Sequence, residues 1–267
     1  MPAIETNGIR MYYEEHGDGP PLVCIMGITA AGAVWEAHVA EWRKDFRCIV
    51  ADNRGVGQSD MPPGPYTSAM MADDYAGLME ALAIESAHVV GCSMGSTIAQ
   101  QLALRHPRKV RSAVLMCPWA RCDRYAAGVF EHLKHIKARL TPAEFANYVQ
   151  LLIFSKPRWD DDAAYAEMLA ARELAAVAPA PQPLHAREAQ AAACIGHDVL
   201  GELGNIACPC LVIGGRADIF TPPWMAEEIA ARIPGCELHL YDGAGHAFHW
   251  ERLEDFNRRV VRWFQAH

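Results

Sequence analysis

The segment Gly91-Cys92-Ser93-Met94-Gly95 places a serine between two glycines, after an apolar run and before a helix-like run. This spacing predicts a sharp turn from a strand into a helix, with the Ser93 hydroxyl raised above the sheet. We expect both glycine positions to exclude a side chain, because the turn is too tight for one. The first N–H groups of the following helix would stabilise negative charge developing at Ser93. The pattern therefore predicts a nucleophilic serine.

A serine hydroxyl becomes a good nucleophile only when a base removes its proton and an acid orients that base. Asp218 follows the predicted strand 210–213, and His246 follows the predicted strand 237–241. His249 is an alternative base, but the position of His246 directly after a Gly-Ala-Gly sequence favours His246. Ser93, Asp218 and His246 are therefore the expected catalytic residues.

Asp218 has a competing structural interpretation, as the cap of a helix that begins near Pro222. An acid could also follow an earlier strand, but the sequence there, 117–120, has no carboxylate before Asp123. Asp218 is therefore the expected partner of His246.

Asp52 and Arg54 lie in a glycine-containing turn after a predicted strand. Residues of these types in such a turn usually pin the loop by hydrogen bonds, so we expect a structural role for both. Cys92, beside the expected nucleophile, invites a thiol mechanism. The position before the serine in this kind of turn normally points into the core, which favours a packing role for Cys92.

Candidate metal ligands lack the spacing of a metal site. Cys208 and Cys210 have no second ligand pair, and a solvated helix face explains the remaining group, Glu131, His132 and His135. The run 55–57, Gly-Val-Gly, is not followed by the lysine or the third glycine of a phosphate-binding loop. We expect no metal ion and no cofactor.

The composition, with 267 residues of which 51% are hydrophobic and 21% charged, suits a single enzyme-sized core. A net charge of -8 disfavours a nucleic acid or an anionic membrane as partner. The N-terminus lacks the pattern of a leader peptide, and no apolar stretch is long enough to cross a bilayer. Nine cysteines, lying mostly in apolar runs, indicate reduced thiols. We expect a cytoplasmic protein that acts on a small molecule; the sequence leaves homo-oligomer formation open.

Two kinds of sequence pattern divide the chain. From 1 to 117, short strand-like runs alternate with helical runs, which predicts βαβ units around a mostly parallel sheet. From 118 to 204 the chain has alanine-rich amphipathic segments and a proline cluster at 179–183, and the alternation resumes from 205 to 267. The sequence therefore predicts an α/β fold with a doubly wound, mostly parallel sheet and a helical cap inserted between its two parts.

The chain resembles the α/β-hydrolase fold superfamily over essentially its whole length. The matching motifs are Met26-Gly27-Ile28, the run from Asp52 to Ser59, the turn around Ser93, and Gly243-Ala244-Gly245-His246. The order serine, aspartate, histidine along the chain is also the order of this superfamily. Within it, the small cap and the run 62–67 are similar to the 3-oxoadipate enol-lactonase and aminoacrylate hydrolase groups.

This resemblance implies an oxyanion hole made by the backbone N–H groups of Ile28 and Met94. Many relatives carry a histidine where this chain has Met26, but a backbone donor functions with any side chain. The implied activity is cofactor-free hydrolysis of an ester or lactone of a small organic acid through an acyl-enzyme on Ser93. Alternatives on the same residues are hydrolysis of a C–N or C–C bond and peracid formation. A hormone-receptor-like binder is an alternative of a different class.

Substrate contacts are expected from side chains under the cap. Arg121, Arg124 and Arg187 could bind a substrate carboxylate, although exposed arginines are the commoner outcome. Aromatic and sulfur side chains that could line the pocket, or equally pack the cap on the core, are Trp119, Phe130, Tyr148, Phe154, Trp159, Phe220 and Met225.

Overall fold

A computed structural model describes residues 2–137, 139–177 and 182–267 of the chain, so most of the proline cluster at 179–183 lies outside the described residues. The strands are β1 (Ala3–Thr6), β2 (Ile9–His16), β3 (Pro21–Ile25), β4 (Arg47–Ala51), β5 (Ala87–Cys92), β6 (Val110–Met116), β7 (Cys210–Gly215) and β8 (Glu237–Tyr241). Over the described residues they form one eight-stranded sheet in the order β1-β2-β4-β3-β5-β6-β7-β8. Beginning with β4, each strand in this spatial order pairs in parallel with the next, through β3, β5, β6 and β7 to β8. By contrast, β2 pairs antiparallel with both β1 and β4.

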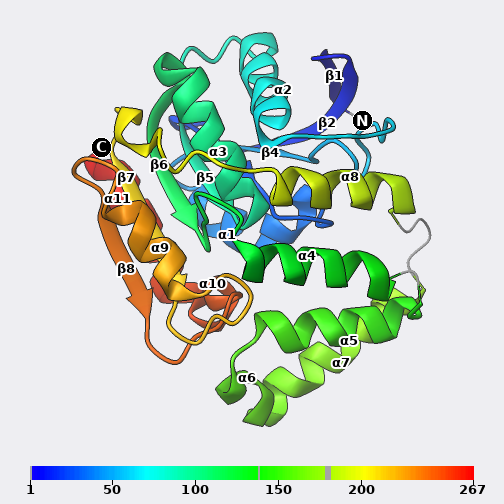
Figure 1. Cartoon of the computed structure of the whole chain (residues 1–267). Coiled ribbons are helices and arrows are strands. Elements are labelled where there is room, and N and C mark those ends of the chain that lie inside the picture. The colour runs from blue at the N-terminus through cyan, green and yellow to red at the C-terminus, as the bar shows by residue number, and fades with distance from the viewer. Residues whose placement is uncertain (1, 138, 178–181) are drawn as a thin grey trace.

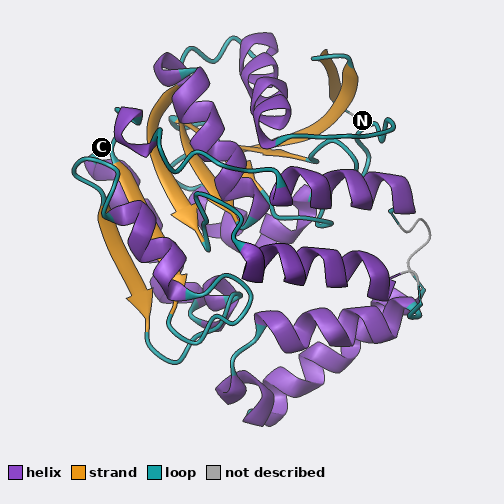
Figure 2. Cartoon of the chain, in the orientation of Figure 1, coloured by secondary structure: helices purple, strands orange, loops and turns teal. Residues whose placement is uncertain are grey.

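The helices complete a layered α/β architecture (Figures 1 and 2). They are α1 (Glu36–Trp42), α2 (Ser68–Ala81), α3 (Met94–Arg105), α4 (Arg124–Lys137), α5 (Pro142–Ile153), α6 (Lys156–Asp160), α7 (Asp162–Ala176), α8 (Leu184–Ile195), α9 (Pro223–Ala230), α10 (Phe248–Glu251) and α11 (Leu253–Ala266), with short 3-10 helices at Gly32–Trp35, Pro107–Lys109 and Leu203–Asn205. In the described part of the chain, no helix is both long enough and apolar enough to cross a membrane.

The central strands are buried on both faces, and this explains why their sequences are continuous apolar runs. Along β3, Leu22 and Cys24 contribute to one hydrophobic core, and Val23 and Ile25 contribute to the other. Successive strand residues point to opposite faces, so the two cores lie on opposite sides of the sheet. Residues of α2, α3 and α9 fill one core, and residues of α1, α10 and α11 fill the other. The predicted doubly wound, mostly parallel α/β sheet is confirmed.

The helices α4 to α8 lie between β6 and β7 in the chain, within the segment 118–204 that is distinct in sequence. Figure 1 shows them as a group to one side of the sheet, with α5, α6 and α7 farthest from it. Their ends carry strong local signals: Thr141 and Glu144 form a reciprocal capping box at the start of α5, and Asp161 accepts a hydrogen bond from the Ala164 N–H at the start of α7.

Candidate active site

Ser93 lies between the last residue of β5 and the first residue of α3, in a strained backbone conformation with φ 54° and ψ -118°. A Cβ atom at Gly91 would lie 2.3 Å from the carbonyl oxygen of Gly95. A Cβ atom at Gly95 would lie 2.1 Å from the carbonyl oxygen of Ile25 on β3. Both contacts are with backbone, which cannot rotate away, so the steric reason for the two glycines is confirmed.

A cavity of about 220 Å³ opens in front of Ser93, and His246 lies on its wall. Most of its lining is apolar and comes from the loop after β3 and from α4, α5 and α8. Ser93 Oγ is buried and has no hydrogen-bond partner among the described residues. Buried hydroxyls almost always have a partner, so the free Ser93 hydroxyl is available to a molecule in the cavity.

His246 and Asp218 form a buried, hydrogen-bonded pair beside this cavity. His246 Nδ1 lies 2.8 Å from Asp218 Oδ2, and the other carboxylate oxygen accepts the N–H groups of Phe220 and Thr221 at 2.7 and 2.9 Å. Burial lowers the pKa of His246, but the charge and hydrogen bond of Asp218 outweigh it and leave the pKa above its ordinary value. Asp218 therefore orients the imidazole and stabilises its protonated form.

Thr221 is a polar contact of this pair that the sequence did not reveal. Its hydroxyl lies 3.0 Å from Asp218 Oδ2, 3.1 Å from His246 Nδ1 and 3.3 Å from the carbonyl oxygen of Cys117. Asp218 also accepts backbone N–H groups of the loop before α9, but α9 begins after Pro222 and has no side-chain cap, so the capping interpretation does not describe Asp218.

Ile28 lies in the loop after β3, and Met94, which follows Ser93, is the first residue of α3. Both Gly27 and Ile28 line the cavity, and a Cβ atom at Gly27 would lie 3.3 Å from Ser93 Cβ, so this loop passes close to the serine. The first N–H groups of a helix have no carbonyl partner within it, which leaves the Met94 N–H available at the same place. Ile28 and Met94 are thus near Ser93, as the resemblance implies, with their backbone N–H groups as candidate oxyanion donors.

Side chains from other elements hold the loop after β3 in place. Asn53 Nδ2 donates to the carbonyl oxygen of Met26 at 2.8 Å, and Gln190 Oε1 on α8 accepts the N–H of Thr29 at 2.9 Å. Gln190 Nε2 donates in turn to the carbonyl oxygen of Arg54 at 2.9 Å. A single buried glutamine therefore connects the loops after β3 and β4 and helps to order the loop that carries Ile28.

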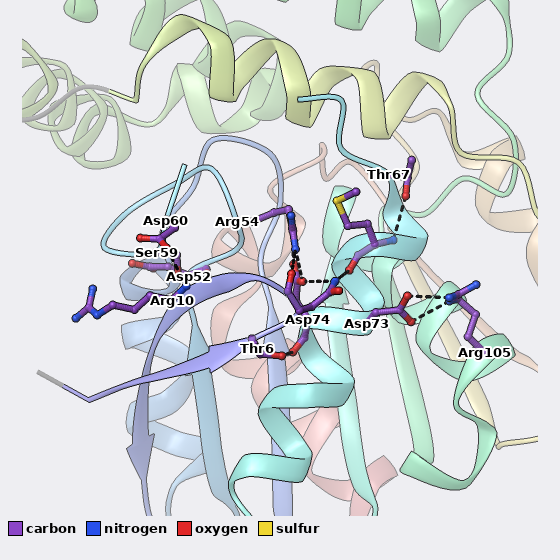
Figure 3. A network of polar contacts seen from close by, with 12 residues as sticks. Thr6, Arg10, Asp52, Arg54, Ser59, Asp60, Thr67, Asp73, Asp74 and Arg105 are labelled. Atoms are coloured by element: carbon purple, nitrogen blue, oxygen red, sulfur yellow. Dashed lines mark hydrogen bonds and ion pairs between the residues drawn. The ribbon is translucent and has the colours of Figure 1, made fainter. Parts of the chain in front are cut away.

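The polar residues after β4 form the network in Figure 3. Asp52 accepts the N–H groups of Gly32 and Gln58 at 2.6 and 2.7 Å. Arg54 is buried and forms two hydrogen bonds to Asp74 on α2, at 2.6 and 2.5 Å. These contacts agree with the expected structural role of Asp52 and Arg54, since neither residue lines the cavity.

A chain of buried polar groups lies behind Ser93. Cys92 Sγ lies 3.9 Å from His249 Nε2, His249 Nδ1 lies 2.9 Å from His38 Nε2, and His38 Nδ1 lies 2.7 Å from Asn257 Oδ1. Burial, followed by the neighbouring His249, lowers the pKa of His38 to about 3, so His38 is neutral. A neutral His38 that donates to Asn257 must accept from His249, which leaves His249 Nε2 facing the Cys92 thiol. His249 thus has partners other than Asp218, in keeping with the choice of His246 as base.

Cys117, Asp218 and His246 have potential metal-ligand atoms within 4.8 Å of one another. The Cys117 thiol donates to the carbonyl oxygen of His246 at 3.0 Å, and burial raises the pKa of that thiol well above its ordinary value. A protonated thiol beside an aspartate already bonded to histidine is a poor donor set for a cation. We therefore interpret this cluster as part of the Asp218–His246 pair.

Of the side chains predicted from sequence to contact substrate, the structure places Phe130, Arg187 and Phe220 on the cavity wall, and the Phe220 ring lies 4.8 Å from that of His246. Trp119 is fully buried between Phe130 and His197 and donates to the carbonyl oxygen of Cys194. Arg121 is exposed. Trp119 and Arg121 thus lie outside the cavity, because Trp119 points into the core and Arg121 points into solvent.

Phe154 and Trp159 also lie outside the cavity. The ring of Phe154 packs against Trp250 and beneath the Arg158 guanidinium, and Trp159 packs against Tyr165 on α7. Both residues lie at or beyond the end of α5, where the chain turns away from the sheet. The wall residues that were not among the predicted contacts come from helix faces that a single sequence does not orient: Leu133, Lys134, Phe145, Val149, Leu152, Ile153 and Trp250.

Comparison with known proteins agrees with this geometry. A model of the alpha/beta hydrolase fold matches residues 20–253. The chain belongs to the α/β hydrolase fold family. Membership of this family supports a hydrolase activity, while the bond and the substrate vary among its members.

Individual relatives within the α/β hydrolase fold family differ in named activity. The chain is 35% identical over 264 residues, 97% of its length and 98% of the relative, to a Mycobacterium tuberculosis protein named as a non-heme bromoperoxidase, BpoC. It is 28% identical over 266 residues to an Azorhizobium caulinodans protein named as a carbamate hydrolase, RutD, with 98% and 97% covered. The crystal structure of the enol-lactonase from Burkholderia xenovorans LB400 superposes with a TM-score of 0.87 at 25% identity, covering 99% of this chain and 100% of that one.

Proposed function

We propose that the protein is a serine hydrolase that cleaves a carboxylic ester or lactone of a small organic acid. The observation that carries this proposal is one cavity lined by both Ser93 and His246, in which Ser93 Oγ is buried without a protein partner and His246 is bonded to buried Asp218. Because Ser93 and His246 are both buried, transfer of a proton between them is favoured over solvation of either group by water.

The proposed reaction uses Ser93 as nucleophile and His246 as base, then acid. His246 Nε2 takes the proton of Ser93 as Oγ attacks the substrate carbonyl, and the N–H groups of Ile28 and Met94 bind the oxyanion. His246 then gives its proton to the leaving alcohol, and an acyl-enzyme remains. A water molecule deprotonated by His246 attacks this ester, which releases the acid and restores Ser93.

The cavity supports a small, largely apolar acyl or alcohol group. Its volume of about 220 Å³ is below the usual range for drug-sized ligands, roughly 300–1,000 Å³. Phe130, Phe145, Leu152 and Phe220 line it, so a short chain would be desolvated on entry. We expect activity to fall steeply for long acyl chains.

The test is hydrolysis of p-nitrophenyl acetate, butyrate and decanoate by wild type and by Ser93→Ala, with Ser86→Ala, an exposed serine, as the matched control. We expect wild type and Ser86→Ala to share a preference for the short esters, and Ser93→Ala to lose at least about a thousandfold in kcat. Mass spectrometry of wild type quenched during turnover should show the acyl group on Ser93. Full turnover by Ser93→Ala would refute the mechanism. Tight ester binding without turnover by wild type would favour a receptor.

Peracid formation is a second candidate, favoured by the 35% identity to BpoC over nearly the whole chain. In this reaction hydrogen peroxide replaces water as the nucleophile that attacks the acyl-enzyme, and a peracid leaves in place of the acid. Bromination of monochlorodimedone in acetate, bromide and peroxide would detect it. We expect any bromination to depend on Ser93 and on the carboxylic acid, and its absence under conditions of active ester hydrolysis would exclude this candidate.

A further inference from the structure

A group of cationic side chains surrounds one part of the cavity wall, formed by the ring of Phe145 on α5. The Lys137 ammonium lies 4.0 Å from the centre of this ring, and the Arg187 guanidinium lies 6.0 Å from it. Arg187, on α8, and Lys134, on α4, line the cavity itself. Two helices of the insertion, α4 and α8, therefore bring positive charge to the wall that the Phe145 ring of α5 forms.

These cations outnumber their acidic partners. Lys134 pairs with Glu131 at 2.9 Å, whereas Arg187 and Lys137 form no ion pair within the described residues. Arg187 is buried, with 6% of its surface exposed; Nη2 donates to the carbonyl oxygen of Gln182 at 3.0 Å, and Nε has no partner among the residues described. An unpaired, buried guanidinium is costly in the empty protein, because it has lost water and gained no anion.

The two unpaired cations also affect each other. Burial, and then the charge of Arg187, lowers the pKa of Lys137 to about 8. Burial lowers the pKa of Arg187 as well. An anion bound beside Arg187 would remove both penalties at once, by pairing the free donor and by offsetting the repulsion between the two side chains.

We propose that Arg187 binds a carboxylate of the substrate, so that the enzyme acts on esters or lactones that carry a free acid group. This inference rests on the proposed function and names its substrate class. The guanidinium fits a carboxylate because its N–H groups form a planar fork. The remaining wall is apolar and suits the short carbon chain between the acid group and the scissile bond. Lys134 and Lys137 add positive charge near this point.

The kinetic test compares pairs of methyl esters matched in chain length. The acidic substrates are the monomethyl esters of succinate, glutarate and adipate, and the neutral substrates are methyl butyrate, valerate and hexanoate; release of acid is followed in a pH-stat. The variants are Arg187→Met, which keeps an unbranched side chain but removes the guanidinium and its charge, and Arg121→Met, at an exposed arginine outside the cavity.

We expect wild type and Arg121→Met to prefer an acidic ester to its neutral match. Arg187→Met should lower kcat/KM for the acidic ester by roughly 10- to 100-fold, mostly through KM, because a charged hydrogen bond is lost. Its kcat/KM for the neutral ester should stay within about twofold, which also shows that the variant is folded. Equal losses on both esters, or a wild type without preference, would overturn the inference.

A binding test separates this inference from the proposed reaction. Glutarate should raise the Tm of wild type and of Ser93→Ala, and should leave that of Arg187→Met unchanged, since mass action stabilises only a protein that binds it. No shift in wild type would overturn the carboxylate site even if esters are hydrolysed. A shift that depends on Arg187, without hydrolysis of any ester, would keep the site and refute the proposed reaction.

Discussion

The adjacent residues Asp73 and Asp74 on α2 form ion pairs of the same chemistry in different surroundings (Figure 3). Arg54 and Asp74 are 6% and 1% exposed, whereas Arg105 and Asp73 are 44% and 31% exposed. Replacing one partner of a buried pair leaves an uncompensated charge, whereas an exposed charge recovers water. The same substitution at the two arginines should therefore have very different costs.

We expect Arg54→Met to lower the free energy of unfolding by about 3–5 kcal/mol. Arg54 supplies two of the hydrogen bonds that Asp74 accepts, and only Asn7, at 2.8 Å, remains among the side-chain donors of the described residues. Arg105→Met should cost about 0–1 kcal/mol, because Asp73 keeps His106 at 2.8 Å and water. Urea unfolding, followed by far-UV circular dichroism and tryptophan fluorescence, measures both.

The pH dependence of the stability cost of Arg54→Met tests whether the uncompensated charge of Asp74 causes that cost. Burial raises the pKa of Asp74 above its ordinary value, and Arg54 acts in the opposite direction. Without Arg54 the pKa of Asp74 in the folded protein rises further. Asp74 then takes up a proton at a higher pH in the folded protein than in the unfolded chain, where its pKa is near 4. The cost of Arg54→Met should therefore be largest at pH 8 and should shrink as the pH falls towards 5. Equal costs for the two arginines, or a cost independent of pH, would refute the reasoning.

Two further predictions concern the active site. Asp218→Asn should lower kcat for ester hydrolysis by about 10⁴-fold. It should also shift the acid limb of the pH–rate profile, expected above pH 6.5 in wild type, to lower pH, because Asp218 raises the pKa of His246 against the effect of burial. A pH–rate profile unchanged in position would count against the Asp218–His246 pair. Gly95→Ala should lower kcat by about 100-fold, because its Cβ would lie 2.1 Å from the Ile25 carbonyl oxygen and must displace the end of β3 and the loop that follows it. The control is Gly128→Ala on α4, where the added Cβ would meet nothing within 4 Å. Its free energy of unfolding in urea should rise by about 0.5–1 kcal/mol. Similar behaviour of the two variants would contradict the steric argument.

The features that were predictable from the sequence depend on short-range constraints. The turn around Ser93 can be recognised from its local sequence pattern, although only the contact that excludes a side chain at Gly91 is local, since the one at Gly95 is with Ile25 on β3. The parallel strands are apolar runs because both of their faces are covered, and that pattern needs no knowledge of partners. By contrast, the short strand β1 had no distinct sequence signal and was not predicted.

The composition of the cavity wall was not predictable in the same way. Trp119 and Phe145 are both aromatic residues after β6, yet one packs into the core and the other lines the cavity. Gln190 has no local signal at all, because its partners, Thr29 and Arg54, are more than a hundred residues away. Such roles depend on which face of each helix meets the sheet.

The sequence by itself determined the α/β sheet, the strained turn that carries Ser93, and the expectation of an acid and a base after later strands, because each of these depends on local sterics or on a repeating apolar pattern. Only the tertiary structure decided that His246 shares a cavity with Ser93, that Gln190 orders the loop of Ile28, and that Arg187 is buried without an acidic partner. The physical reason is that burial and pairing are properties of side chains from distant segments, and they exist only after those segments have packed together.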